Sequence, residues 1–172
     1  MTEIRSGALK FKGSPVNVVG PELKVGDKAP ANFTLVANDM AELRGADLAG
    51  KPRILVAVPS LDTPVCDLET RRFNEEAVKI PGVQVYTVSV DLPFAQKRWC
   101  GNAGVERVQT LSDFRARDFG PAHGAWLPSL GLLARAVFVV DATDTVRHVE
   151  YVAEVTSEPD YAAAIAAARA LA

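Results

Sequence analysis

The sequence predicts a single α/β domain with a mixed central sheet flanked by helices. An apolar run over 54–58, within a predicted strand at 53–58, is typical of a buried strand, and apolar residues at helical spacing follow it. Residues 83–90 then alternate between apolar and polar types, as a half-buried strand does. Strands that alternate with helices indicate an α/β fold, and the unit from 53 to 90 should be parallel and right-handed. A strong strand at 134–141 with an antiparallel partner at 146–152 makes the predicted sheet mixed.

The composition fits one folded domain over residues 1–172. The chain is 48% hydrophobic, which is enough for a buried core, and its formal net charge is only −2. Its Lys and Arg residues are scattered, which argues against a nucleic-acid surface or a polybasic membrane patch. No apolar run approaches the ~20 residues that cross a bilayer, and residues 1–19 lack the apolar core of a signal peptide. We therefore expect a cytoplasmic protein that binds neither nucleic acid nor membrane.

The elements before the central unit are short. Two β-prone runs over about 8–19 flank a turn at Gly13, so we expect an N-terminal β-hairpin. The next expected elements are a loop at 25–30, a strand at 33–37, a turn at 38–39 and a helical turn at 46–50.

The helix of the central unit should begin just after the buried strand. Thr63 is a good N-cap residue, and Pro64 suits the first helical position, which makes Cys66 the third. The expected buried face of this helix consists of Val65, Leu68, Phe73, Ala77 and Ile80, and Pro81-Gly82 follows it.

The rest of the chain continues the same alternation. A short helix should begin at Pro93 and end before Gly101, and a strand at 108–111 should follow it. We then expect a helix at 115–119 and a loop at 120–131. The two antiparallel strands come next, and an alanine-rich helix at 159–171, capped by Ser157, should close the chain. This is the plan of a thioredoxin-like domain with an N-terminal extension.

Cys66 is the candidate reactive residue. The unpaired N–H groups at the positive end of a helix favour an anion, so a cysteine in the first turn is biased toward its reactive thiolate form. The alternative is an inert buried cysteine that packs as a small hydrophobe. The Thr-Pro start of the helix favours a reactive Cys66, but on spacing alone an inert, buried Cys66 remains an equal alternative.

Cys100 is the second cysteine, and it lies near the end of a predicted helix, where the helix dipole disfavours a thiolate. It is either a second, resolving thiol or a semi-buried cysteine without a role. If the two cysteines pair, the bond should be transient and catalytic rather than structural. They do not form a C-x-x-C motif, and with His123 and His148 they show no metal-ligand spacing.

Arg135 interrupts the apolar start of the strand at 134–141. Its side chain either reaches water at the edge of the sheet or points at the cysteine turn. In the second case its guanidinium would stabilise a thiolate and then a developing oxyanion.

Three separated motifs resemble the peroxiredoxin family. Pro59, Thr63 and Cys66 match its P-x-x-x-T-x-x-C signature. The turn at 59–66, together with Asp91-Leu92-Pro93-Phe94-Ala95-Gln96, Arg98 and Cys100, is similar to the bacterial thiol peroxidase branch of atypical two-cysteine peroxiredoxins. The segment 133–137 matches the one that carries the family's active-site arginine, and the resemblance extends over nearly the whole chain.

The resemblance implies a role for each of these residues. Cys66 would be the peroxidatic cysteine, Thr63 and Arg135 would hold the thiolate and the peroxide, Pro59 would shield the pocket, and Cys100 would be the resolving cysteine of the same chain. It also implies reduction of hydrogen peroxide and organic hydroperoxides, thioredoxin as reductant, a homodimer, and no metal, haem or flavin cofactor.

Two other function classes would use the same residues. A peroxide-sensing redox relay or binding module would use the cysteine pair without turnover, and steady-state peroxide consumption with thioredoxin would distinguish it from an enzyme. A thioredoxin-like scaffold would carry inert cysteines, which would not be labelled quickly at about pH 6.

Overall fold

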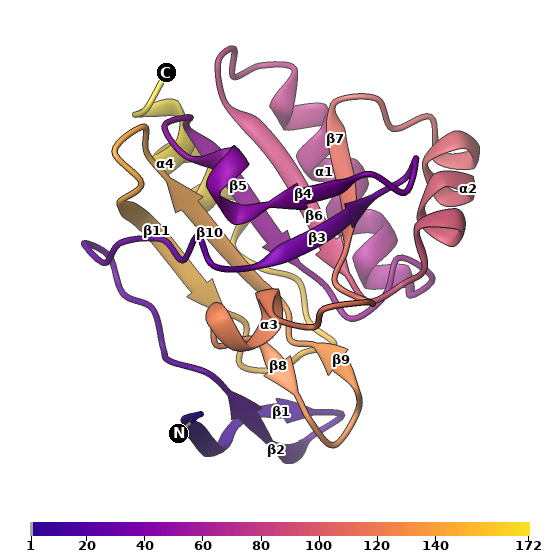
Figure 1. Cartoon of the computed structure of the whole chain (residues 1–172), viewed down its shortest axis with the longest axis vertical. Helices are drawn as coiled ribbons and strands as arrows, with labels where there is room; N and C mark the ends of the chain where they lie inside the picture. The colour runs from indigo at the N-terminus through magenta and orange to yellow at the C-terminus, as the bar shows by residue number, and fades with distance from the viewer. Residues whose placement is uncertain (1) are drawn as a thin grey trace.

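A seven-stranded mixed sheet forms the centre of the structure, a computed structural model that describes residues 2–172 (Figure 1). Its strands lie in the order β11-β10-β5-β6-β7-β3-β4. Their bounds are β3 Thr34–Ala37, β4 Glu42–Arg44, β5 Arg53–Ala57, β6 Gln84–Ser89, β7 Val108–Ser112, β10 Ala136–Val140 and β11 Val146–Tyr151. β5, β6 and β7 are parallel, whereas β10 pairs antiparallel with both β5 and β11. The predicted mixed sheet and its parallel β-α-β unit are therefore confirmed.

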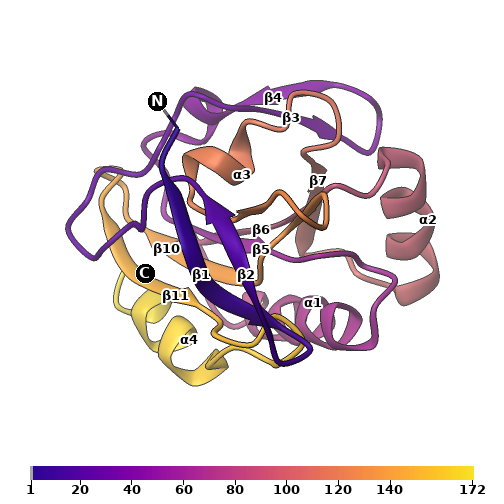
Figure 2. The same ribbon diagram turned by 90° about the horizontal axis from the view of Figure 1, so that it is seen from below.

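Helices cover the sheet because its central strands are apolar on both faces. α1 (Pro64–Ala77) connects β5 to β6, α2 (Pro93–Ala103) connects β6 to β7, and α4 (Tyr161–Arg169) closes the chain. α1 and α4 lie on the same side of the sheet (Figure 2), where they pack on a cluster that includes Ile54 and Val56. Their neighbours Leu55 and Ala57 point to the opposite face, toward α3 (Phe119–Ala122). Every residue of β5 is consequently buried.

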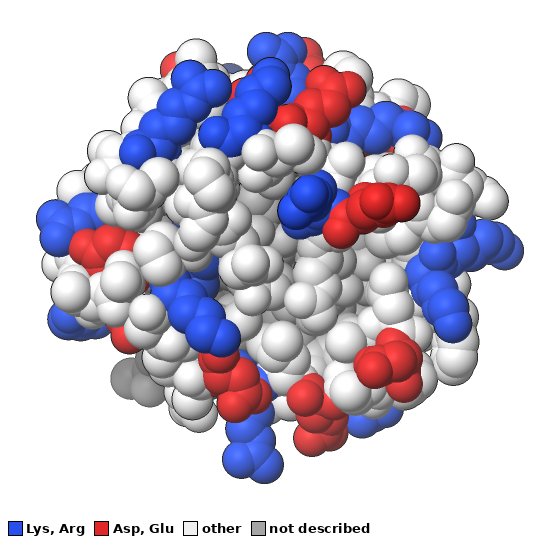
Figure 3. Space-filling view, turned by 90° about the horizontal axis from the view of Figure 1, so that it is seen from above, with Lys and Arg blue, Asp and Glu red and all other residues white. Residues whose placement is uncertain are grey.

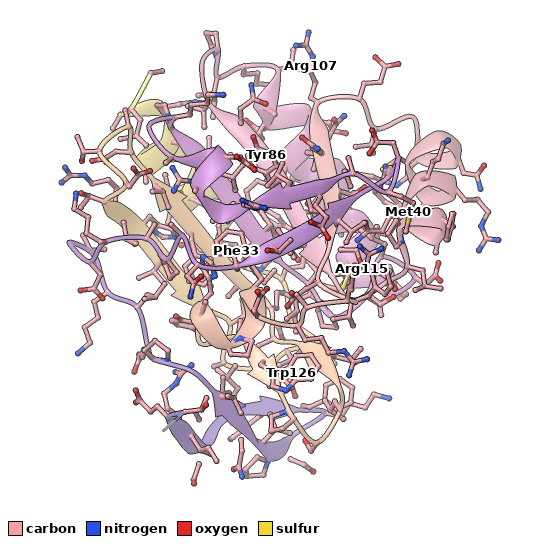
Figure 4. The ribbon with its side chains drawn as sticks, in the orientation of Figure 1. Phe33, Met40, Tyr86, Arg107, Arg115 and Trp126 are labelled. Carbon is pink, nitrogen blue, oxygen red and sulfur yellow. The ribbon has the colours of Figure 1, made fainter. Side chains whose placement is uncertain are left out.

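A second, four-stranded sheet joins the N-terminal hairpin to a later segment. It consists of β1 Ile4–Phe11, β2 Ser14–Val19, β8 Trp126–Leu127 and β9 Leu132–Leu133. Lys12 and Gly13 both have positive φ, 50° and 81°, as a two-residue type I′ hairpin turn requires. Trp126, marked in Figure 4, pairs with Val19 where the two parts meet. The structure thus contains the predicted hairpin, which begins earlier than expected.

The predicted buried face of α1 is only partly right. Phe73 is buried, as is Ile80 just after the helix, but Leu68 is exposed, and the helix also buries Cys66, Glu69 and Thr70. The first turn directs Cys66 into the protein, and the residues three, four and seven positions later share its face of the helix. A charged residue, Glu69, therefore lies where the sequence suggested an apolar one.

Several shorter elements also differ from expectation. α1 ends at Ala77, and Gly101 lies inside α2, whose left-handed C-cap is Gly104. Residues 115–118 form no helix, and the expected loop at 120–131 contains most of α3 and all of β8. β4 was not predicted, and Asp160 rather than Ser157 caps α4. A tertiary contact explains the position of α3, because the buried Asp113 carboxylate accepts hydrogen bonds from the N–H groups of Phe119 and Gly120. Local pattern carries no information about such a contact.

The surface carries no concentration of one charge on the face shown in Figure 3, where basic and acidic side chains are interspersed. None of the helices between residues 2 and 172 has the length and apolar character to cross a membrane. Across the same residues, no three His, Cys, Asp or Glu side chains gather in a way that could hold a metal ion.

His123 should make the fold sensitive to acid. Its ring is stacked on Phe119 with centroids 4.1 Å apart, and its Nδ1 donates to the Phe119 carbonyl at 3.0 Å. Burial lowers the pKa of His123 from 6.5 to about 4. The unfolded chain therefore binds a proton that the folded chain excludes, and the fold loses on the order of 3 kcal/mol as the pH falls from about 6.5 to 4.

Urea unfolding of the wild type and His123→Phe at about pH 7 and pH 4.5 measures this loss. The variant should lose clearly less stability on acidification than the wild type. The variant is needed because Asp113 also titrates between these two pH values. Burial raises the pKa of Asp113 to about 6, so the folded chain takes up a proton there as the pH falls, which stabilises the fold and offsets part of the loss due to His123. Equal losses in both proteins would show that His123 does not carry the effect.

Candidate active site

The turn between β5 and α1 is held in place by the end of β6. Asp91 accepts hydrogen bonds from Ser60 Oγ at 2.7 Å and from the Leu61 backbone N–H at 2.8 Å. Ser89 Oγ, in the last residue of β6, donates to the same carboxylate at 2.7 Å. Asp91 therefore fixes the turn relative to the sheet.

Thr63 orients the first turn of α1. Its hydroxyl donates to the Ser60 carbonyl at 3.1 Å, which leaves its oxygen to accept the Cys66 backbone N–H at 3.2 Å. Pro64 occupies the first helical position, as predicted, and Cys66 occupies the third. Cys66 is fully buried, so its sulfur lies at the positive end of α1 and away from bulk water.

Arg135 points at the sulfur of Cys66. Its Nη2 donates to Cys66 Sγ at 3.2 Å, and its Nε donates to the Val155 carbonyl at 2.9 Å. The side chain is only 2% exposed, so the interpretation of Arg135 as an edge residue that reaches water is wrong. The carbonyl contact fixes the plane of the guanidinium, and its positive charge consequently faces the thiol.

Glu69 is the second partner of this guanidinium. It lies one turn after Cys66 on α1, is fully buried, and accepts a hydrogen bond from Arg135 Nη1. Burial raises the pKa of Glu69 to about 7, although the attraction of Arg135 opposes the shift. The guanidinium of Arg135 therefore lies between two acidic groups, the Glu69 carboxyl and the Cys66 thiol.

A pocket of about 350 Å³ opens over this group of residues. Its lining combines the cysteine turn, the tip of the N-terminal hairpin and the segment before α4: Phe11, Lys12, Pro59, Thr63, Pro64, Val65, Arg135, Val155 and Thr156. Figure 2, which views the end of the molecule that carries the hairpin, shows the β1–β2 turn close to the start of α1. Backbone hydrogen bonds between Lys10 and residues 153 and 155 hold the hairpin there. The pocket thus has largely apolar walls, with polar groups of Thr63 and Arg135 next to Cys66.

Comparisons with known proteins agree with this geometry. Residues 24–165 match the redoxin family model. The chain is 57% identical to a thiol peroxidase of Halalkalibacterium halodurans. The aligned stretch of 163 residues covers 95% of this chain and 98% of the relative. The chain is 53% identical to a thiol peroxidase of Bacillus subtilis, over 95% of this chain and 97% of the relative. The chain belongs to the redoxin family.

Within the redoxins, the chain is a peroxiredoxin of the bacterial thiol peroxidase branch, as its motifs indicated. The crystal structure of a peroxiredoxin-like protein from Aquifex aeolicus is 42% identical to it, with a TM-score of 0.90 and coverage of 99% of both chains. The predicted thioredoxin-like fold is therefore confirmed.

Cys100 of this redoxin lies in the last turns of α2, apart from the Cys66 group. Its sulfur is 3.3 Å from Thr110 Oγ1 on β7, and the side chain is partly exposed. Both cysteines are free thiols. The structure therefore brings together Pro59, Thr63, Cys66 and Arg135, but it does not bring Cys100 to them.

Sequence reasoning assigned no role to four residues of the redoxin site. Glu69 and Asp91 provide its buried and turn-anchoring carboxylates, and Phe11 and Val155 provide two of its apolar walls. The spacing of three residues between Cys66 and Glu69 was a usable signal, because such residues share one face of a helix. No local signal connects Phe11 or Val155 to the cysteine turn.

Proposed function

We propose that this redoxin is a thiol-dependent peroxidase that reduces hydrogen peroxide and organic hydroperoxides through Cys66. The observation that carries the proposal is the 3.2 Å hydrogen bond from Arg135 Nη2 to Cys66 Sγ at the start of α1. The thiol peroxidase names of relatives that are 57% and 53% identical support the same activity. They favour turnover over a peroxide-sensing relay or binding module.

In the first step, the Cys66 thiolate attacks the distal oxygen of the peroxide. A sulfur–oxygen bond forms, the oxygen–oxygen bond breaks, and the leaving oxygen takes a proton to become water or alcohol. Sulfur is oxidised by two electrons to sulfenic acid. We assign Thr63 and Arg135 the tasks of holding the thiolate and the peroxide, and Pro59 the task of shielding the pocket from water.

Thiolate formation provides only a small part of the rate. A free thiol is a few per cent ionised at pH 7, so full ionisation gains roughly 30-fold, or about 2 kcal/mol. The remainder has to come from donors that bind more tightly as charge moves onto the leaving oxygen. Arg135 and Thr63 both line the pocket beside Cys66 and are the side chains suited to this task.

The pocket supports organic hydroperoxides as substrates beside hydrogen peroxide. Its volume of about 350 Å³ exceeds what hydrogen peroxide needs. Phe11, Pro59, Val65 and Val155 would contact an apolar tail while the peroxide group lies against Arg135.

In the second step, Cys100 resolves the sulfenic acid. Its thiol sulfur attacks the Cys66 sulfur, the sulfur–oxygen bond breaks, and water leaves, which gives an intramolecular disulfide. Thioredoxin then reduces this disulfide by thiol–disulfide exchange. We further infer that the protein acts in the cytoplasm as a homodimer. The exposed apolar side chains of Leu68, Leu92 and Phe94 support the homodimer. The scheme uses no metal, haem or flavin.

A coupled assay tests the proposed function. Peroxide consumption by the wild type should require thioredoxin and thioredoxin reductase and should continue over many turnovers. Consumption that stops after one equivalent of peroxide, with thioredoxin present, would instead indicate a sensor.

Replacing Cys100 with serine should separate the two steps. Cys100→Ser should still consume one equivalent of peroxide and then stop as the Cys66 sulfenic acid, because the second thiol is missing. Mass spectrometry should detect a dimedone adduct on Cys66. If thioredoxin-dependent turnover continued at the wild-type rate, Cys100 would not be the resolving thiol.

A further inference from the structure

The two helices that carry the cysteines are tied together by the residues next to those cysteines. Asp67 follows Cys66 on α1, and Trp99 precedes Cys100 on α2. Trp99 Nε1 donates a hydrogen bond of 2.7 Å to the Asp67 carboxylate. A hydrogen bond to a charged acceptor is among the stronger ones in proteins, so it resists separation of the two helices.

Arg71 adds further contacts between α1 and α2. Its Nε donates to Asp67 at 2.9 Å, and its Nη1 donates to the Ala103 carbonyl at 3.1 Å in the last turn of α2. Carbonyl groups in that turn lack helical partners and favour a cation. The guanidinium also lies 5.8 Å from the centre of the Trp99 ring. We call Asp67, Arg71 and Trp99 the α1–α2 latch.

The Cys100 thiol is bonded to the sheet and not to the Cys66 group. Thr110 donates its hydroxyl proton to Asn38 Oδ1 at 3.0 Å, so its oxygen is left to accept the Cys100 thiol proton across 3.3 Å. Thr110 is buried, which strengthens this chain of bonds. The arrangement directs the Cys100 thiol at β7.

The two sulfurs therefore bond to distant parts of the sheet. Cys66 contacts Arg135, which directly precedes β10, whereas Cys100 contacts β7. β5 and β6 lie between these strands. Both thiols are free, and each is bonded to a partner on a different strand. A disulfide places its two sulfurs about 2 Å apart, so Cys100 must leave Thr110, and the end of α2 held by the latch must move, before the sulfurs can bond.

We propose that the α1–α2 latch controls how the Cys66 sulfenic acid divides between disulfide formation and over-oxidation, an inference that rests on the proposed function. While the latch is closed, Cys100 stays on β7 and a second peroxide oxidises the sulfenic acid to sulfinic acid, being itself reduced to water or alcohol. When it opens, Cys100 attacks the sulfenic sulfur and water leaves with the thiol proton. Asp67, Arg71 and Trp99 are positioning residues, because they act through the placement of Cys100.

Two variants weaken the latch without touching either thiol. Trp99→Phe keeps an aromatic ring but removes the donor to Asp67, and Arg71→Gln removes the contacts with Asp67 and Ala103. Arg72→Gln is the matched control, since Arg72 lies next in sequence but stacks on Tyr161 of α4, 4.6 Å from its ring centre.

Each reduced protein is mixed with one equivalent of hydrogen peroxide, quenched with an alkylating reagent and analysed by mass spectrometry. Disulfide formation should be at least about tenfold faster in Trp99→Phe, which corresponds to about 1.4 kcal/mol. In Arg71→Gln we expect disulfide formation to be about threefold faster, because the ion pair between Arg71 and Asp67 is partly exposed. With excess peroxide, the sulfinic acid yield should fall in the same order. Arg72→Gln should match the wild type, and all four proteins should form sulfenic acid at the same rate.

Hydrogen exchange of the reduced proteins provides a second measurement. The amides of 97–103 should exchange faster in both latch variants than in the wild type or Arg72→Gln. Unchanged disulfide rates or unchanged hydrogen exchange in the two latch variants would overturn the proposal. Slower disulfide formation in these variants would also overturn it, because the latch contacts would then orient Cys100 for attack rather than hold it back. Failure of the wild type to form any sulfenic acid would overturn the proposed function instead.

Discussion

Replacing Cys66 with serine is expected to abolish peroxide turnover. A serine hydroxyl is not ionised near neutral pH and is a far weaker nucleophile than a thiolate. The remaining thiol cannot substitute for it, because Cys100 lies near the end of a helix and bonds to Thr110 rather than to an arginine. The measurement is peroxide consumption in the thioredoxin-coupled assay.

The Cys66→Ser protein should remain folded, since serine is slightly smaller and Arg135 can donate to its hydroxyl. Thermal unfolding followed by circular dichroism provides this control. Substantial turnover by a folded Cys66→Ser protein would show that the nucleophile lies elsewhere.

Replacing Arg135 with alanine should lower the rate of reaction with peroxide by at least ~100-fold, the usual effect of losing one donor that stabilises a transition state. The variant should also be less stable, because Glu69 then lies buried without its cationic partner. Removal of one partner of a buried pair costs about 3–5 kcal/mol. Stopped-flow measurement of peroxide reduction and urea unfolding test the two effects separately.

A double variant distinguishes catalysis from stability. Arg135→Ala combined with Glu69→Gln removes both charges, so stability should recover substantially while the rate with peroxide stays low. Arg135→Lys keeps the charge but cannot reproduce three directed contacts to Cys66, Glu69 and Val155, so it should also react slowly. If the double variant regained the wild-type rate, Arg135 would serve only to neutralise Glu69.

The cysteine turn was predictable because its physics is local. Thr63, Pro64 and Cys66 occupy adjacent positions, and the capping bond joins residues three apart. The buried strand at 53–58 and the alternating strand at 83–90 were predictable for the same reason, since each pattern is complete within a few residues.

The partners of Cys66 were harder to predict because they depend on tertiary contacts. Arg135 is 69 positions from Cys66, and only the pairing of β10 with β5 brings it to the turn. Glu69 was missed because a charged helical residue is usually exposed, and its burial makes sense only once Arg135 is in place. The expected helix at 115–119 failed in the same way, since Asp113 starts α3 later in the chain.

The tip of the N-terminal hairpin forms one wall of the pocket. Cys66 lies on α1 and Arg135 directly precedes β10, whereas Phe11 and Lys12 reach the pocket from the end of β1 and the turn that follows it. That turn takes no part in the Thr63–Cys66 and Arg135–Glu69 contacts, although Lys10 just before it bonds to Val155, whose carbonyl accepts from Arg135. We therefore expect substitutions at residues 11 and 12 to change the shape of the pocket without removing any side chain that contacts Cys66, and a library built at these two positions is the natural starting point for redirecting the enzyme to bulkier hydroperoxides.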